Sequence, residues 1–152
     1  MEIKRVEKND QAVLEDLLEN HIDSSDHLDE RPTFETLERL LEDDRSYLLV
    51  VLINDKVVGY TLAYRFPSLY ASGDMAYLYD IDVVPEHRQK GVGRLLIETV
   101  KACLFRDGVT EAWLGTAVDN WAAQRLFAAT GGIKSGEKFY DYTYVLSKDK
   151  SE

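Results

Sequence analysis

A long amphipathic helix that follows directly after an apolar strand constrains the fold of this chain most. Apolar residues recur between Val92 and Leu104 at the spacing of one helix face, and Gly91 and Gly108 mark its two ends. The preceding segment, residues 75–84, has the composition of a strand. A strand, a short loop and a helix in this order predict a fold in which helices cover a sheet.

The other periodic segments predict a mixed α/β domain. Strands are expected at residues 2–7, 47–53, 57–66, 109–118 and 138–146, and further helices start near residues 10, 34 and 120. Asn54-Asp55 predicts a tight turn, and Asp119 or Asn120 caps the last helix. The expected order is β-α-α-β-β-β-α-β-α-β. The length of 152 residues favours a single domain, residues 1–147, with a polar tail, residues 148–152.

The chain is strongly acidic. Eighteen Lys and Arg residues against 28 Asp and Glu residues give a formal net charge of −10. This balance argues against nucleic acid as a partner, because phosphate binding needs clustered positive charge. It is compatible with a cationic substrate, which an acidic cleft would attract. The alternative is that the acidity serves solubility alone.

Cysteine and hydropathy point to a soluble, cytoplasmic protein. One cysteine, Cys103, excludes an internal disulfide framework, and its place on the apolar helix face favours a core role. The apolar run at residues 47–53 is too short to span a bilayer, and the N-terminus lacks a signal-peptide stretch. The three histidines show no metal-ligand spacing, so no metal is expected. No membrane partner is expected either, because the apolar run is short.

The start of the long helix predicts an anion site. Gly91 and Gly93 leave backbone N–H groups uncovered there, and Arg88, Lys90 and Arg94 add positive charge. The motif differs from a nucleotide-triphosphate loop, which needs Gly-Lys-Ser/Thr, and from the dinucleotide fingerprint, whose glycine spacing is different. A Gly-rich turn with solvated basic residues is the alternative. The candidate ligand-binding residues are Arg88, Gln89, Lys90, Gly91, Val92, Gly93 and Arg94.

This segment resembles the pyrophosphate loop of the GCN5-related N-acetyltransferases (GNAT), which bind acetyl-CoA. Arg88, Gly91 and Gly93 match the family's Arg/Gln-x-x-Gly-x-Gly/Ala. The family's later Asn-x-x-Ala-x-x-Leu-Tyr-x-x-x-Gly is echoed by Asn120, Ala123, Leu126, Phe127 and Gly131. The resemblance implies acetyl-CoA as co-substrate and a mixed, mostly antiparallel central sheet flanked by about four helices. It also implies cofactor contacts from Asn120, Ala123, Phe127, Val83 and Val84.

A narrower resemblance links the chain to the type I aminoglycoside 3-N-acetyltransferases. Residues 77–81, Tyr-Leu-Tyr-Asp-Ile, look like their Tyr-Ile-Tyr-Asp-Leu strand, and residues 86–88, 132–134 and 140–141 match further short motifs. This implies acetylation of an aminoglycoside at the 3-N position, and hence antibiotic resistance. Acetylation of a polyamine, diamine or protein amine remains open, as does a non-catalytic acyl-CoA sensor. Dimers are common among relatives, so a homodimer is also considered.

The resemblance implies direct acetyl transfer, for which we assign candidate catalytic groups. Asp80 is the candidate base, because burial of a carboxylate in an apolar strand raises its pKa. Strand alternation places Asp80 and Asp82 on one face and Tyr77, Tyr79 and Ile81 on the other. The backbone N–H groups of Val83 and Val84 are expected to stabilise the thioester oxyanion, with Val83 in the catalytic set.

The sequence constrains the general acid for the leaving thiolate and the substrate contacts less than it constrains the base. The family's usual acidic tyrosine corresponds to Phe127, which carries no transferable proton. The thiolate then leaves unassisted, or Tyr140 or Tyr142 assists; we place Tyr140 in the catalytic set. Asp26 and Glu30 lie in an acidic loop that is either part of the acceptor cleft or simply solvated. The expected substrate-binding residues are Asp26, Glu30, Tyr79, Asp80, Asp82 and Asp141.

Overall fold

The computed structural model describes residues 1–22 and 32–146. Its strands are β1 (Glu2–Arg5), β2 (Ser46–Ile53), β3 (Lys56–Phe66), β4 (Asp74–Val83) and β5 (Val109–Trp113). Its helices are α1 (Gln11–Asn20), α2 (Phe34–Glu42), α3 (Val92–Arg106) and α4 (Trp121–Ala129), with a short 3-10 helix at Pro85–His87.

The strands form one sheet in the order β1-β2-β3-β4-β5. β1, β2, β3 and β4 pair with one another in antiparallel fashion, and β5 runs parallel to β4. The expected mixed α/β fold with a mostly antiparallel sheet is therefore confirmed. The expected hairpin turn is also present, since Asn54 and Asp55 both have positive φ angles, 52° and 63°, as a tight two-residue turn requires.

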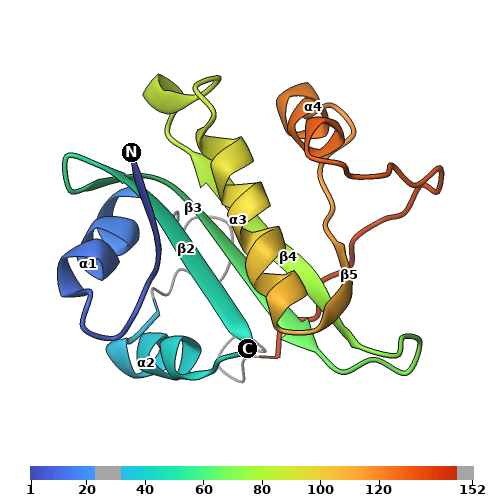
Figure 1. Cartoon of the computed structure of the whole chain (residues 1–152), viewed down its shortest axis with the longest axis horizontal. Coiled ribbons are helices and arrows are strands. Elements are labelled where there is room, and N and C mark those ends of the chain that lie inside the picture. Colours follow the sequence, from blue (N-terminus) through green and yellow to red (C-terminus); the bar gives the residue numbers. More distant parts are fainter. Residues whose placement is uncertain (23–31, 147–152) are drawn as a thin grey trace.

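Each face of the sheet has its own hydrophobic core. On one face, Leu96, Val100 and Leu104 of α3 pack on the sheet, and Figure 1 shows α3 running along that face. On the other face, Leu14 and Leu17 of α1 belong to the second core. The sheet is thus covered by α3 on one side and by α1 and α2 on the other, which leaves the β4–β5 side of the second face less covered.

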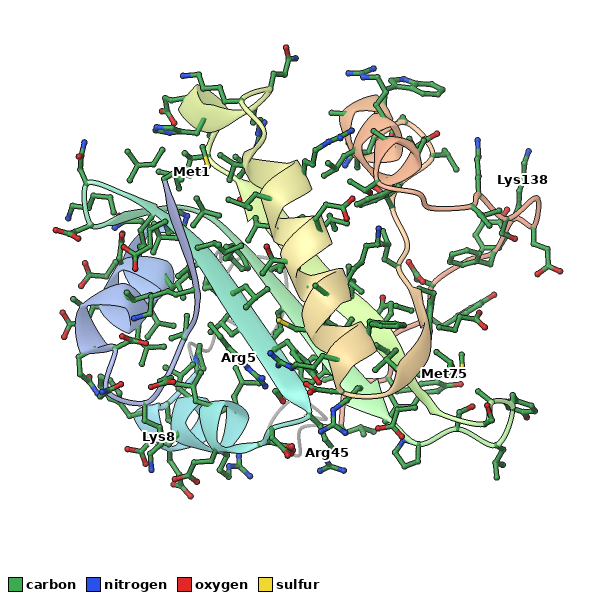
Figure 2. The ribbon with its side chains drawn as sticks, in the orientation of Figure 1. Met1, Arg5, Lys8, Arg45, Met75 and Lys138 are labelled. Carbon is green, nitrogen blue, oxygen red and sulfur yellow. The ribbon has the colours of Figure 1, made fainter. Side chains whose placement is uncertain are left out.

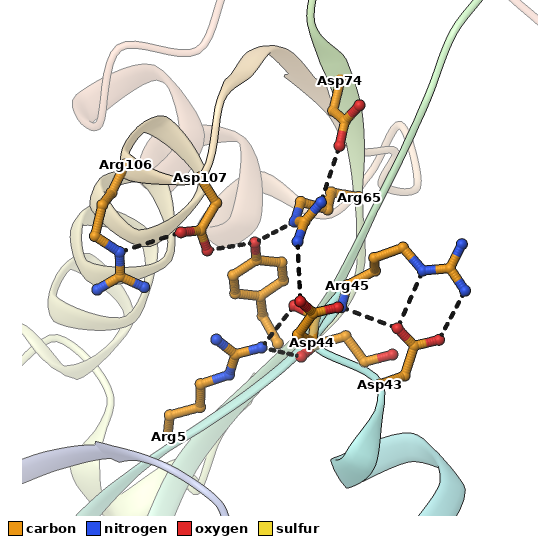
Figure 3. Close-up of polar contacts among 10 residues, drawn as sticks. Arg5, Asp43, Asp44, Arg45, Arg65, Asp74, Arg106 and Asp107 are labelled. Carbon is orange, nitrogen blue, oxygen red and sulfur yellow. Dashed lines mark hydrogen bonds and ion pairs between the residues drawn. The ribbon is translucent and has the colours of Figure 1, made fainter.

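A polar cluster fixes the end of the sheet where α3 finishes (Figure 3). The Arg65 guanidinium donates to the Tyr47 hydroxyl at 2.8 Å and to Asp74 at 3.0 Å. The Tyr47 hydroxyl in turn donates to Asp107 at 2.7 Å, just after α3. Arg5 of β1 donates to the carbonyl oxygen of Ser46 at 2.6 Å. This cluster has a structural role, because it lies at the opposite end of α3 from Gly91.

Two expected elements differ in the structure. The strand expected at 109–118 ends at Trp113, and the segment expected as a strand at 138–146 forms no ladder. Strand propensity alone does not make a strand: a ladder needs a neighbouring backbone, and residues 138–146 have none within the described chain. Figure 2 places Lys138 at the periphery of the molecule. The expected polar tail, residues 148–152, lies outside the described residues.

Candidate active site

The β4 and β5 strands separate partway along their length. They pair from Asp74 opposite Val109 to Tyr77 opposite Trp113, and β5 then ends. β4 continues to Val83, so in the described part of the chain its edge beyond Tyr77 has no neighbouring strand. Such an edge presents unpaired backbone groups to whatever lies beside it.

Backbone direction at this edge singles out two amides. The Val84 N–H donates to the carbonyl oxygen of Val58 in β3 at 2.9 Å. Successive residues of a strand direct their N–H groups to opposite edges, so the N–H groups of Val83 and Ile81 face the open side. On that side, the Arg88 side chain donates to the Val83 carbonyl oxygen at 2.9 Å. Of the two valines considered for an oxyanion, Val83 has the better-placed amide.

The start of α3 provides further backbone donors. Gly91 caps the helix with a φ of 86°, and the first intrahelical bond joins the Leu95 N–H to its carbonyl oxygen at 3.0 Å. The N–H groups of the first three helical residues, 92–94, therefore have no partner inside the helix. A Cβ atom on Gly91 would meet no atom within 4 Å, so the space above this turn is open. These features suit a phosphate group.

Gly93 has a packing role in addition to any ligand contact. A Cβ atom there would lie 2.9 Å from the Leu126 side chain of α4, so glycine lets α4 approach α3 closely. In α4, the Asn120 side chain accepts from the Ala123 N–H at 3.1 Å and caps the helix, as predicted. Phe127 packs against the core beside α3. The later motif thus holds α4 next to the helix start.

A bulge in β4 changes the predicted faces of the strand. Leu62 pairs with Asp80 and Ala63 with Leu78, so Tyr79 is the extra residue. An extra residue reverses the alternation. Tyr77 and Tyr79 consequently lie on the same face as Asp80 and Asp82, and Ile81 alone of the three lies opposite. The prediction that both tyrosines face away from the carboxylates was wrong, because simple alternation cannot anticipate a bulge.

Asp80 is half-buried and held by two neighbours in β3. The Tyr60 hydroxyl donates to its carboxylate at 2.7 Å, and the Thr61 hydroxyl donates to its carbonyl oxygen at 2.8 Å. Burial, and then the hydrogen bond to Asp80, raise the pKa of Tyr60 above its ordinary value. The phenol therefore keeps its proton and acts as a fixed donor. One carboxylate oxygen of Asp80 is oriented this way.

Asp82 lies two residues further along the same face. Its carboxylate is 3.6 Å from the Arg88 guanidinium, and both side chains are about half exposed. An exposed pair of this kind contributes little to stability. It links the β4 edge to the loop that leads into α3.

The remaining predicted residues lie elsewhere. Tyr140 and Asp141 are exposed on the segment beyond α4 and are not part of the sheet. Asp26 and Glu30 lie outside the described residues. Among the residues that are described, no three His, Cys, Asp or Glu side chains gather as a metal site would require. No described helix has the length and apolarity needed to cross a bilayer.

The sequence profile of the Acetyltransferase (GNAT) family matches residues 11–131, which is most of the chain. The chain belongs to the GNAT acetyltransferase family. Members of this family use acetyl-CoA. The match includes the loop, both glycines at the start of α3, and all of α4.

Similar proteins include acetyltransferases of several kinds. The mouse (Mus musculus) N-acetyltransferase family 8 member 3 is 34% identical over 71 residues, which are 47% of this chain and 31% of that protein. The matched region thus spans about a third of that relative's length. Two solved structures are aminoglycoside acetyltransferases from uncultured soil metagenomic samples. One is 25% identical, covering 95% of this chain and 98% of that one, with a TM-score of 0.81. The other, in complex with sisomicin, is 24% identical, covering 96% of both chains, also with a TM-score of 0.81.

Sequence reasoning missed Tyr60 and Trp113 in this GNAT chain. Trp113 is 43% exposed at the point where β4 and β5 separate. Tyr60 is opposite Asp82 in the β3–β4 ladder and reaches Asp80 diagonally. The register of β3 against β4 could have indicated Tyr60, since this pairing places its side chain beside the carboxylates of Asp80 and Asp82.

An apolar pocket of about 280 Å³ lies between the C-terminal half of α3, β5 and α4. Leu78, Ile97, Leu114 and Phe127 line it, together with the Lys101 side chain. It is on the α3 face of the sheet, so β4 separates it from Asp80.

Proposed function

We propose that this protein transfers the acetyl group of acetyl-CoA to a primary amine of a cationic small molecule, an aminoglycoside at its 3-N position. The observation that carries the proposal is the open edge of β4. This strand contains Asp80, and the loop after it leads to the unpaired backbone N–H groups at the start of α3. The solved aminoglycoside acetyltransferases with the same fold support the choice of acceptor, and the net charge of −10 favours a cation. Loss of a positive charge on the drug would weaken its binding to RNA and give resistance.

The cofactor would lie between β4 and the start of α3. Its pyrophosphate would accept from the N–H groups of residues 92–94, with Arg88, Gln89, Lys90 and Arg94 nearby. Its thioester arm would run along the open β4 edge, with Asn120, Ala123 and Phe127 on the α4 side. The helix dipole and the local basic residues supply positive potential in an otherwise acidic protein.

The transfer itself needs a base and an oxyanion donor. Asp80, directly or through water, would accept a proton from the acceptor ammonium, which frees the nitrogen lone pair. The nitrogen then attacks the thioester carbon, the C–N bond forms, and the oxygen gains charge that the Val83 N–H would stabilise. The C–S bond breaks, the thiolate leaves, either unassisted or protonated by Tyr140, and the new amide nitrogen releases its extra proton to water.

Substrate contacts would come from the acidic side of the site. Tyr79 and Asp82 share a face with Asp80, and Asp26, Glu30 and Asp141 would bind further ammonium groups of the acceptor. Asp141 and Tyr140 lie on an exposed segment, so their participation requires that segment to move or to come from a second copy.

We also propose a homodimer in which residues 138–146 of one copy pair with β5 of another. Phe139, Tyr140, Tyr142 and Tyr144 expose large aromatic side chains, and β5 ends the sheet within the described chain. Pairing would give hydrogen-bond partners to the backbone groups of both the open β5 edge and residues 138–146. A dimer in sedimentation equilibrium that dissociates in Tyr142→Pro but not in Ser135→Pro would support this assembly, and a wild-type monomer at micromolar concentration would contradict it.

A coenzyme A release assay with gentamicin, spermidine and a lysine peptide tests the function. The proposal predicts thiol release with gentamicin. Release with spermidine but not gentamicin would replace the aminoglycoside with a polyamine. No release with any amine, despite binding of acetyl-CoA, would favour an acyl-CoA sensor.

A further inference from the structure

Five aromatic side chains form a continuous row across β3, β4 and β5. Ring centroids of Tyr64 and Tyr79 are 6.1 Å apart, as are those of Tyr79 and Tyr77. The Tyr77 ring lies 5.3 Å from Trp113, whose ring lies 5.5 Å from Phe66. These spacings are typical of packed aromatic pairs. We call these five residues the aromatic row.

The ring orientations leave faces available to a ligand. Tyr79 meets Tyr64 at 80° and Tyr77 at 87°, so these rings touch edge to face, whereas Tyr77 and Trp113 meet at 34° and partly stack on one another. Tyr79 is 60% exposed despite its two aromatic contacts. Trp113 is 43% exposed, and aromatic rings with accessible faces recognise alkylammonium groups in proteins.

The position of the row places it beside the candidate base. Tyr79 is the bulge residue next to Asp80, on the face where Tyr60 holds the Asp80 carboxylate. Tyr77 and Trp113 are the last pair before β4 and β5 separate. The row therefore borders both the opened β4 edge and the carboxylates of Asp80 and Asp82.

The charges around the row favour a cation as its occupant. Asp80 contributes negative charge on the same face, Asp82 beside it is paired with Arg88 at 3.6 Å, and the whole chain carries −10. The negative faces of aromatic rings attract cations, and Trp and Tyr are the strongest such rings. An exposed aromatic surface next to carboxylates thus suits an ammonium group attached to an apolar or ring-shaped body.

We propose that the aromatic row binds an ammonium group of the acceptor, other than the one acetylated, through the exposed rings of Tyr79 and Trp113. This inference rests on the proposed function for its placement in the reaction. It adds a requirement on the substrate, which must carry a second ammonium group besides the reacting amine. It also means that a quaternary ammonium ion, which cannot be acetylated, binds here and competes with the acceptor.

Tryptophan fluorescence tests the binding without any turnover. The chain has two tryptophans, so Trp121→Phe leaves Trp113 as the reporter. Tetramethylammonium chloride is titrated against sodium chloride at equal ionic strength. We expect a saturable change that weakens about 3- to 30-fold in Tyr79→Ala and survives in Tyr79→Phe, which keeps the ring. Tyr70→Ala removes a more exposed tyrosine in the β3–β4 loop and should leave the titration unchanged.

The outcomes separate this inference from the proposed function. No saturable response, or an equal response in Tyr79→Ala, overturns the aromatic site. A response that appears only as the protein is diluted would mean that a second copy covers the row, which also overturns it. A response that depends on Tyr79, with no acetylation of gentamicin, keeps the site and rejects the proposed function. With active enzyme, Tyr79→Ala should raise the acceptor KM about 3- to 30-fold and leave kcat unchanged.

Discussion

The Tyr60 hydroxyl donates a 2.7 Å hydrogen bond to the Asp80 carboxylate across the β3–β4 ladder. Tyr60 belongs to the core formed with α1, so its ring is fixed by packing. The fixed donor holds one oxygen of the Asp80 carboxylate in place. A residue far from Asp80 in the sequence thereby positions the candidate base.

Removal of that donor should slow the reaction without weakening cofactor binding. Hydrogen bonds to charged groups contribute about 1.5–3 kcal/mol, so Tyr60→Phe should lower kcat about 10-fold or more. Tyr47→Phe is the matched control, because it also removes a buried tyrosine hydroxyl bonded to an aspartate, but at the other end of the sheet. Equal loss of kcat in the two variants would mean that Tyr60 acts through stability alone.

Substitution of the candidate base should have a larger effect. Asp80→Asn keeps the shape of the side chain and can still accept from Tyr60, but it cannot take up a proton. General-base catalysis contributes about 10²- to 10⁴-fold, so kcat at neutral pH should fall at least a hundredfold. Asp82→Asn on the same face should lose much less. Asp80 is not the base if the Asp80→Asn variant retains wild-type rates across the pH range.

The anion site can be tested with two glycines of similar geometry. Gly91 and Gly108 have φ angles of 86° and 89°, and a Cβ atom on either meets no atom within 4 Å. Both Gly91→Glu and Gly108→Glu should therefore cost about 1–2 kcal/mol of stability through backbone strain. Gly91→Glu alone should abolish acetyl-CoA binding in calorimetry, because it places a carboxylate beside the pyrophosphate. Cofactor affinity that falls equally in both variants would contradict the assignment of the loop.

The polar cluster of Arg65, Tyr47 and Asp107 at the far end of α3 should make the stability of the protein depend on pH. Hydrogen bonds from Tyr47 and then from Arg106 lower the pKa of Asp107 below its ordinary value. A lowered pKa stabilises the fold above the unfolded-state value of about 4 and loses that contribution as the pH falls further. Asp107→Asn should therefore destabilise the protein at pH 7, and its difference from wild type in urea unfolding should shrink below about pH 4. A difference that stays constant down to pH 2 would exclude this linkage.

Local signals in the sequence were sufficient for much of the fold. The apolar spacing of α3, the positive-φ turn at Asn54-Asp55 and the Asn120 cap each depend on residues close in the chain. The Gly91–Gly93 helix start is equally local, and it indicated where backbone donors would be available. The family match over residues 11–131 includes this segment.

The contacts around Asp80 depend on pairing between strands, which a single sequence shows poorly. The bulge at Tyr79 shifts two tyrosines to the carboxylate face, and no local pattern marks it. Residues 138–146 have the composition of a strand, but a strand needs a neighbouring backbone to pair with, and the local sequence does not identify one. Trp113 lies at the β4–β5 separation because β5 ends there, whereas the strand was expected to continue to residue 118.

Mass spectrometry of gentamicin after incubation with the protein and acetyl-CoA tests acetyl transfer to an aminoglycoside. We predict a single acetyl group on the drug, located by NMR at the 3-N position, and its loss in Asp80→Asn and Gly91→Glu. Unmodified gentamicin, recovered with wild-type protein that binds acetyl-CoA, would show that the drug is not an acceptor.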